Sequence, residues 1–332
     1  MKRTKIVKAI MSIVLAVATI ISATTLSLTT TSAATWTADI SPISDHPSTK
    51  GHQMYAGCIN GMSFQQDGIV SYNGYQYAAY WNTNGYLTLA RRSYSKSGAS
   101  FGNWQELTFN YQITKFNNPD SHNTISIGIS KGDGVLHLAF DTHAVENNYM
   151  MSTVGFLNDP SKFTVSNFYG SYKSDYLGTY GSTWQRMITY PRFLSLLNGD
   201  MIFEFRQGNS GCANNLFYYY TSATHTWKEI GAYVHGSKCN DYSDLNSSYC
   251  AYINGLNSKM VNGKERIYTT WCTRDTGDNT TNKDLYATYS DDYGYTWYSL
   301  TVEVSYLVLL SVTGLVAFLE SIFFSDICTR FS

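Results

Sequence analysis

The chain is 332 residues long, and 15% of its residues are aromatic while only 14% are charged. So large an aromatic share excludes a disordered chain. The 23 Lys and Arg residues balance 24 Asp and Glu residues, for a net charge of −1, which excludes the strongly basic surface of most nucleic-acid-binding proteins. The 28 Tyr and 25 Gly residues favour a β-rich, secreted protein that handles sugars.

The N-terminus has the three parts of a secretory signal peptide. Basic residues come first, at Lys2, Arg3, Lys5 and Lys8. An apolar run follows from Ile10 to Ile21, and the small residues Ser32–Ala34 offer a cleavage site. This order is typical of an exported protein whose leader is removed. We therefore expect residues 1–34 to be a signal peptide and the mature protein to be secreted; an N-terminal membrane anchor is the alternative.

Residues 68–299 repeat one pattern four times. Each copy has a strand, a turn with Gly, a second strand, a loop, a third strand and then Trp or Phe. The second strands are spaced by 60, 65 and 66 residues and contain Ala78–Trp81, Leu138–Asp141, Phe203–Arg206 and Thr269–Cys272. The closing aromatic residues are Trp104, Phe163, Trp227 and Trp297. Such four-stranded antiparallel repeats are typical of propeller blades. We expect an all-β propeller domain over residues 35–300.

Two local motifs support this interpretation. Asn73-Gly74 and Asn262-Gly263 separate first from second strands, and Asn-Gly favours tight hairpins because both residues tolerate positive φ. Residues 290–297 read S-x-D-x-G-x-x-W, an Asp-box, between the third and fourth strands of the last copy. We expect this box to be a folding device, pinned by Asp292 and Trp297, and not a catalytic motif.

The C-terminal tail, residues 301–332, differs in composition from the repeats. Sixteen residues from Val304 to Leu319 carry no charge, which is short of the roughly 20 apolar residues of a spanning helix. One interpretation is a weak membrane anchor over residues 304–324. The other, which we favour, is that the propeller domain ends near Leu300 and is incomplete, with four blades and part of a fifth from residues 36–66.

Polar residues gather where first strands begin and second strands end. Antiparallel pairing brings these two positions to the same face of every blade. The residues concerned are His122, Asn123, His143, Tyr190, Arg192, Arg206, Tyr252 and Arg274. Two His, several Arg and Tyr form a cationic site that can transfer protons, which suits an acidic sugar.

Each of these residues also has a structural interpretation. A given Tyr can simply pack, and Arg192 can brace a blade through a salt bridge. The pair of His residues could hold a metal ion, but no third ligand is evident at a suitable spacing, so we predict no cofactor, with a structural metal as the open alternative. The other histidines, His225 among them, show no constellation and are expected in loops or on the surface, except His137, which is expected to be structural. Of the six cysteines, Cys239 and Cys250 could close a short disulfide loop.

The motifs resemble the BNR-repeat family that contains ulvan lyases and related rhamnosyl-glucuronate-cleaving enzymes. The resemblance rests on Ser121-His122-Asn123, on Asp141-Thr142-His143, on Tyr190-Pro-Arg-Phe and on Phe-Arg206-Gln-Gly, and it extends from about Gly57 to Trp297. It implies a seven-bladed propeller that cleaves uronic-acid polysaccharides by β-elimination. This chain departs from the family by lacking the last blades.

The resemblance also implies roles for the residues. Arg206 would neutralise the uronate carboxylate, His122 or His143 would be the base, and Tyr190 would be the acid, or both acid and base. Asn123, Arg192, Tyr252 and Arg274 would bind an acidic polysaccharide. The alternatives are a glycoside hydrolase, for which the carboxylates near the face are Asp120, Asp141, Glu146 and Glu204, and a propeller that binds sugar without catalysis.

Overall fold

The computed structural model describes residues 60–62, 64–95, 100–169, 187–234, 236 and 250–300. The expected signal peptide and C-terminal tail lie outside these ranges, and so does Cys239. Within them every helix is a 3-10 turn of three residues: η1 (Phe156–Asn158), η2 (Pro160–Lys162), η3 (Val165–Asn167) and η4 (Asn279–Thr281). None of these described helices has the length or apolar character needed to cross a membrane.

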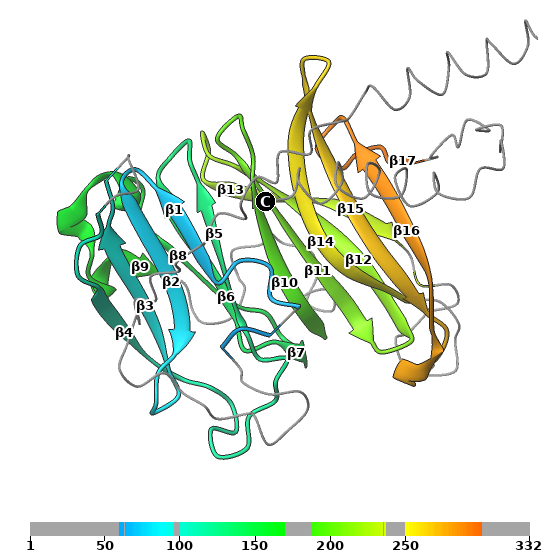
Figure 1. Ribbon diagram of the computed structural model, residues 1–332, viewed down its shortest axis with the longest axis horizontal. Helices are drawn as coiled ribbons and strands as arrows, with labels where there is room; N and C mark the ends of the chain where they lie inside the picture. The colour runs from blue at the N-terminus through cyan, green and yellow to red at the C-terminus, as the bar shows by residue number, and fades with distance from the viewer. Residues whose placement is uncertain are drawn as a thin grey trace, which may run out of the picture. The chain divides into compact units, whose positions relative to one another are not determined.

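The described residues form four antiparallel sheets in chain order (Figure 1). The first sheet contains β1 (Ile69–Tyr72), β2 (Tyr75–Trp81), β3 (Tyr86–Ser93) and β4 (Gln105–Gln112). The second contains β5 (Ile125–Ser130), β6 (Val135–Phe140), β8 (Asn148–Ser152) and β9 (Phe168–Tyr169). The third contains β10 (Ile188–Ser195), β11 (Met201–Asn209), β12 (Cys212–Thr221), β13 (Thr226–Val234) and the short β7 (His143–Val145). The fourth contains β14 (Cys250–Val261), β15 (Lys264–Arg274), β16 (Asn282–Ser290) and β17 (Tyr298–Ser299).

These sheets confirm the propeller predicted from the repeats. The four predicted second strands coincide with β2, β6, β11 and β15 or overlap their ends, and each of these is an inner strand of its sheet. The predicted Asn-Gly turns have the expected backbone, with φ of 46° at Asn73 and 80° at Gly74, and 49° at Asn262 and 79° at Gly263. Positive φ at both positions matches the twist of the flanking strands.

The Asp-box is a folded turn that joins the third and fourth sheets. Asp292 Oδ1 accepts a hydrogen bond from Ser290 Oγ at 2.8 Å, and Ser290 Oγ accepts one from the backbone N–H of Gly294 at 2.8 Å. The Trp297 ring packs edge-on against Phe217 of β12, with centroids 5.2 Å apart. The box therefore pins one sheet to its neighbour, as expected of a folding device.

Aromatic layers fill the space between neighbouring sheets. Trp81 and Phe140 pack together between the first and second sheets, and Phe193, Phe203 and Trp227 pack between the second and third. His137 lies fully buried in the second layer, where its Nδ1 is 2.7 Å from the Tyr149 hydroxyl and burial lowers its pKa to about 3. This is the structural position predicted for it.

A segment before β1, described at residues 60–62 and 64–68, crosses all four sheets. Its hydrogen bonds run from Asn60 Nδ2 to Trp81 O of β2, from Gln65 Nε2 to Ile125 O of β5 and from Gln66 Nε2 to Phe193 O of β10. The Gln66 side chain also accepts from Leu256 N of β14 at 2.8 Å. The described residues of this crossing segment form no strand, so they add no part of a fifth blade.

The possible disulfide between Cys239 and Cys250 does not form. Cys250 has a free thiol, which is buried on β14, whereas Cys212 takes part in a disulfide. The short spacing suggested a closed loop, but the Cys250 side chain is taken into the packed start of the fourth sheet.

Candidate active site

A tight loop before β5 positions His122. Asp120 Oδ1 accepts a hydrogen bond from the backbone N–H of His122 at 2.9 Å, and Asp120 O accepts one from Asn123 N at 3.0 Å. Asp at the start of such a turn is favoured because its side chain bonds the backbone two residues on. The same Oδ1 lies 2.6 Å from His122 Nδ1, so one carboxylate oxygen sets both the loop and the ring.

His143 reaches the site from a strand that changes sheets. The sequence predicted it at the end of the second strand of copy two, but β6 ends at Phe140 and His143 begins β7, which pairs with β10 of the third sheet. The Ala144 N–H donates to Thr189 Oγ1 at 2.9 Å, and φ is positive at Asp141 and Ala144, at 56° and 52°. This sharp crossover places His143 beside the third sheet.

A β-bulge turns Tyr190 toward the histidines. In the β10–β11 ladder Thr189 pairs with Arg206 and Arg192 with Glu204, so two residues of β10 oppose one of β11. The extra position suits Pro191, which has no N–H for the ladder. Tyr190 has φ of 59°, and bulges re-aim side chains in this way.

Four aromatic rings meet at this point. His122 lies between Phe64 of the crossing segment and His143, with centroid distances of 5.2 Å and 4.0 Å and interplanar angles of 15° and 18°. The Tyr190 ring is 5.1 Å from Phe64 and 5.6 Å from His122. The loop, β7, the bulge and the crossing segment therefore build one cluster.

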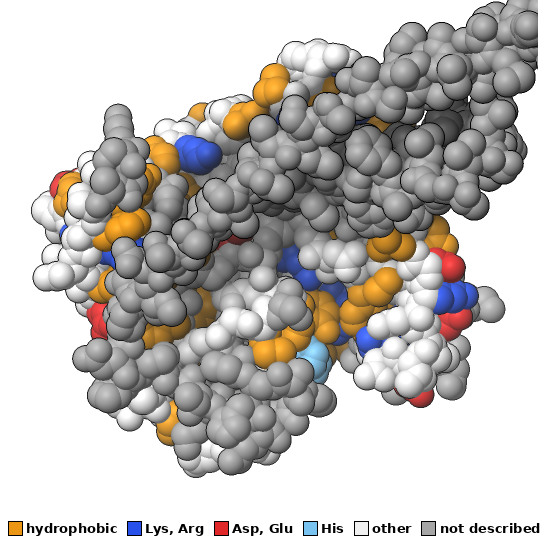
Figure 2. Space-filling view, viewed as in Figure 1, with side chains coloured by type: hydrophobic (Ala, Val, Ile, Leu, Met, Phe, Trp, Pro, Cys, Tyr) orange, Lys and Arg blue, Asp and Glu red, His pale blue; other side chains and the backbone are white. Residues whose placement is uncertain are grey.

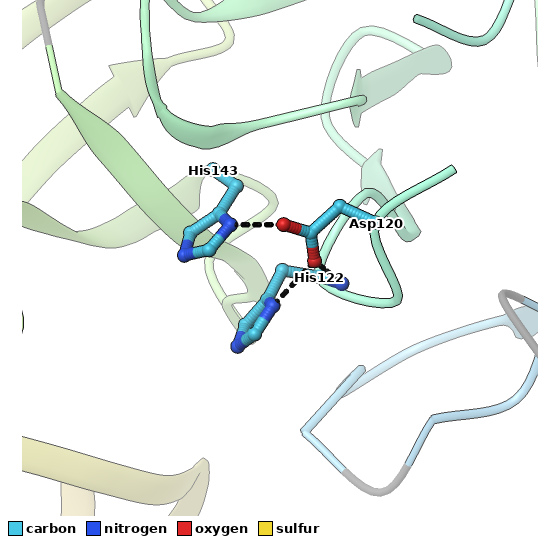
Figure 3. A group of neighbouring side chains, drawn as sticks. All are labelled: Asp120, His122 and His143. Atoms are coloured by element: carbon cyan, nitrogen blue, oxygen red, sulfur yellow. Dashed lines mark hydrogen bonds and ion pairs between the residues drawn. The ribbon is translucent and has the colours of Figure 1, made fainter. Parts of the chain in front are cut away.

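A single carboxylate connects the two imidazoles. Asp120 Oδ2 lies 2.5 Å from His143 Nδ1, and Oδ1 bonds His122 (Figure 3). Burial alone would raise the pKa of Asp120, but the hydrogen bonds from the two rings and from the His122 N–H outweigh it and hold that pKa well below its usual range. Asp120 is therefore ionised at neutral pH.

Arg206 is a buried cation with no counter-charge among the described residues. Its side chain is 2% exposed, no ion pair or hydrogen bond to its guanidinium occurs within the described ranges, and its Nε is buried without a partner. Its Cζ lies 4.9 Å from the centroid of the Tyr190 ring and 5.2 Å from that of Tyr252. A cation held by two rings and facing no carboxylate is prepared to receive an anion.

Tyr190 has a protonated hydroxyl at neutral pH. Burial raises its pKa, and the positive charge of Arg206 opposes that rise without cancelling it. No hydrogen bond from the Tyr190 hydroxyl to another side chain or backbone group occurs in the described part of the chain. The group can therefore donate a proton to a bound molecule.

Tyr252 and Arg274 extend the site along the fourth sheet. Arg274 Nη1 donates to the Tyr252 hydroxyl at 2.6 Å and to Ser210 Oγ at 2.7 Å, and the Tyr190 and Tyr252 ring centroids are 6.1 Å apart. Figure 2 shows Lys or Arg, histidine and hydrophobic side chains near one another among the atoms in view.

Arg192 and Asn123 have supporting positions. Arg192 is as buried as Arg206, but its Nη1 pairs with Glu204 Oε2 at 3.1 Å and its Nη2 donates to Ile253 O at 2.9 Å. This matches the bracing salt bridge named as its alternative. Asn123 is buried, and its backbone O accepts from Trp81 Nε1 at 2.8 Å.

Asp120 supplies a third potential metal ligand, which the spacing of the sequence did not reveal. Ligand atoms of Asp120, His122 and His143 lie within 4.8 Å of one another. However, both Nδ1 atoms are already hydrogen-bonded to the carboxylate, and the two rings are stacked nearly parallel, so their Nε2 lone pairs run side by side. Ligands of one ion converge on it, so the geometry favours acid–base use of these rings.

Phe64 was not predicted as a site residue, and Asp120 was considered only as a possible hydrolase carboxylate. Phe64 precedes the first repeat, where no periodicity marks it. His225 also makes a side-chain contact that was not expected. Its Nδ1 is 2.9 Å from Asp133 Oδ2, at the opposite end of β5 and β6 from the candidate site.

The fold and the cluster define a propeller protein with a candidate site of His, Tyr and Arg side chains. A family model described as "BNR repeat-containing family member" matches residues 75–306, and the chain belongs to this family. The chain is 27% identical over 198 residues to "Ulvan lyase, long isoform" of Pseudoalteromonas sp. (strain PLSV), and 26% identical over 198 residues to the protein of the same description from Alteromonas sp. (strain LOR).

Solved lyase structures share the fold. The polysaccharide lyase Uly1 matches with a TM-score of 0.57 and 22% identity, over 73% of this chain and 56% of that one. A family PL25 ulvan lyase bound to -[GlcA(1-4)Rha3S]- matches with a TM-score of 0.52 and 13% identity, over 77% and 58%. The curated matches cover 52% of this chain but only 19% of each relative, so the chain aligns with about a fifth of their length.

Proposed function

We propose that this protein is a secreted polysaccharide lyase that cleaves a uronic-acid polysaccharide of the glucuronate–rhamnose type by β-elimination. The observation that carries the proposal is Arg206, a buried guanidinium without a counter-charge in the described structure. It lies beside Tyr190, whose ring is in turn 5.6 Å from that of His122. The similarity to ulvan lyases supports this substrate class.

The reaction assigns one task to each group. Arg206 pairs with the uronate carboxylate and makes the neighbouring C5 proton more acidic. The Nε2 of His122 or His143 takes that proton, and the C5–H electron pair becomes the C4=C5 double bond. The C4–O bond breaks with its electrons going to the leaving oxygen, which takes a proton from the Tyr190 hydroxyl. The products are a reducing end and an unsaturated uronate.

The remaining residues have binding and supporting roles in this proposal. Tyr252 and Arg274 contact neighbouring sugars, since they continue the site along β14 and β15. Arg192 supports the Tyr190 bulge, because its Nη1 also donates to Tyr190 O at 3.2 Å. Asn123 supports the His122 loop from its buried position.

Three of the four carboxylates near the face, Asp120, Asp141 and Glu204, do not favour a glycoside hydrolase. Hydrolysis uses a pair of carboxyl groups that flank the scissile bond. Asp120 is bonded to both histidines, Asp141 Oδ2 accepts from Tyr111 and Thr114, and Glu204 is buried against Arg192. No two of these three carboxylates stand together and open to a substrate.

One assay tests the proposal. The chain is incubated with a glucuronate–rhamnose polysaccharide, and the ultraviolet absorbance of the unsaturated uronate is followed together with the reducing ends. Both should rise in step, and the Tyr190→Phe variant should serve as the inactive control. New reducing ends without ultraviolet absorbance would indicate a hydrolase instead of a lyase. Retention of the protein on the polymer without product would indicate a binding protein.

A further inference from the structure

One carboxylate forms hydrogen bonds with two imidazoles in this site, through a different oxygen for each ring. Asp120 Oδ1 lies 2.6 Å from His122 Nδ1, and Oδ2 lies 2.5 Å from His143 Nδ1. Figure 3 shows the remaining nitrogen of each ring on the side away from Asp120. The side chain of Asp120 is partly buried, with 22% of its surface exposed, so water competes little for its oxygens.

This geometry determines which nitrogen of each neutral ring carries the proton. An ionised carboxylate only accepts hydrogen bonds, and Asp120 is held in its ionised form. Each Nδ1 must therefore donate its hydrogen to Asp120. In a neutral imidazole one nitrogen is the donor and the other the acceptor, so Nε2 is the acceptor in both rings.

We propose that Asp120 is a positioning residue that fixes His122 and His143 in the same tautomer and presents two Nε2 acceptors to the substrate. Its chemical consequence rests on the proposed elimination, whereas the tautomers themselves do not. Without Asp120, either ring could turn its Nε2–H toward the substrate and lose its function as a base.

The test is the Asp120→Asn variant, which has nearly the same shape. Its amide accepts through one atom and donates through the other, so one of the two rings must switch its hydrogen to Nε2. Nitrogen-15 NMR of labelled histidine should show two Nδ1–H tautomers in the wild-type chain and one of each kind in the variant. With the polysaccharide, kcat should fall about 10²- to 10⁴-fold while KM changes little.

The controls separate this proposal from the proposed function. His225→Ala removes a carboxylate–imidazole contact away from the site, with Asp133, and should leave both kcat and the two site tautomers unchanged. A thermal melt of Asp120→Asn close to wild type excludes general unfolding. Tautomers as expected in a chain without lyase activity would reject the proposed function and retain the positioning role. An Nε2–H tautomer in the wild type, or an unchanged pair in Asp120→Asn, would overturn the positioning role itself.

Discussion

Replacing Arg206 with Met should remove activity without removing stability. Met keeps most of the apolar contact with the Tyr190 and Tyr252 rings but carries no charge. The wild-type side chain gains about 1–2 kcal/mol from each ring as a cation–π contact. Against this gain stands a cost of several kcal/mol for burying a cation that has no ion-pair partner among the described residues. We expect the free energy of unfolding of Arg206→Met to lie within about 1 kcal/mol of wild type.

Arg192 is the matched control for this prediction. It is buried to the same extent, at 2% exposed, but it pairs with the fully buried Glu204. Arg192→Met leaves that carboxylate buried without its cation and should cost about 3–5 kcal/mol. Urea unfolding of both variants measures the difference.

The two readouts together decide the role of Arg206. Its Met variant should lose at least about 10²-fold in kcat/KM on the uronate polymer, as expected when a group that stabilises transition-state charge is removed. If Arg206→Met instead destabilised the fold as much as Arg192→Met, Arg206 would be a structural residue. The proposal that Arg206 binds the substrate carboxylate would then be wrong.

Three further predictions concern single residues. Tyr190→Phe should lower kcat about 10²- to 10⁴-fold with little change in the melting temperature, and turnover near wild type would remove Tyr190 as the acid. His137 has a pKa of about 3 in the folded protein, below its unfolded value of about 6.5. The unfolded chain therefore binds a proton more readily between these values, and the folded protein loses stability as pH falls through them. From pH 6.5 to 5 the free energy of unfolding of the wild type, measured in urea, should fall by about 2 kcal/mol more than that of His137→Leu. Asp292→Ala breaks the bonds to Ser290 Oγ and Thr296 N and should cost about 1–3 kcal/mol while the folded fraction keeps its kcat, whereas a selective loss of kcat would make the Asp-box part of the site.

The sequence predicted the sheets well because local rules set them. Asn-Gly fixes a hairpin through its own backbone preferences, as at Asn73 and Asn262, and regular spacing reveals the repeat. The shared face of His122 and Tyr190 was also predictable, because each comes at the start of a first strand and these starts lie at the same face of every blade.

Two features of the site depend on geometry that the sequence does not encode locally. The bulge at Tyr190 shifts the β10–β11 register, and this shift places Arg192 opposite Glu204, with which it forms its ion pair. The contact of Phe64 with His122 depends on the crossing segment, which is fixed by hydrogen bonds to strands far away in the chain. Pro191 was the only local signal for the bulge.

The most direct test of the proposed chemistry is to compare the uronate polysaccharide with the same polymer after its carboxyl groups have been reduced to alcohols. Reduction removes the group that Arg206 is proposed to bind and the acidity of the C5 proton, and it leaves the rest of the chain intact. We expect ultraviolet-absorbing product from the first polymer and no cleavage of the second. Cleavage of the carboxyl-reduced polymer at a comparable rate would contradict the proposed elimination.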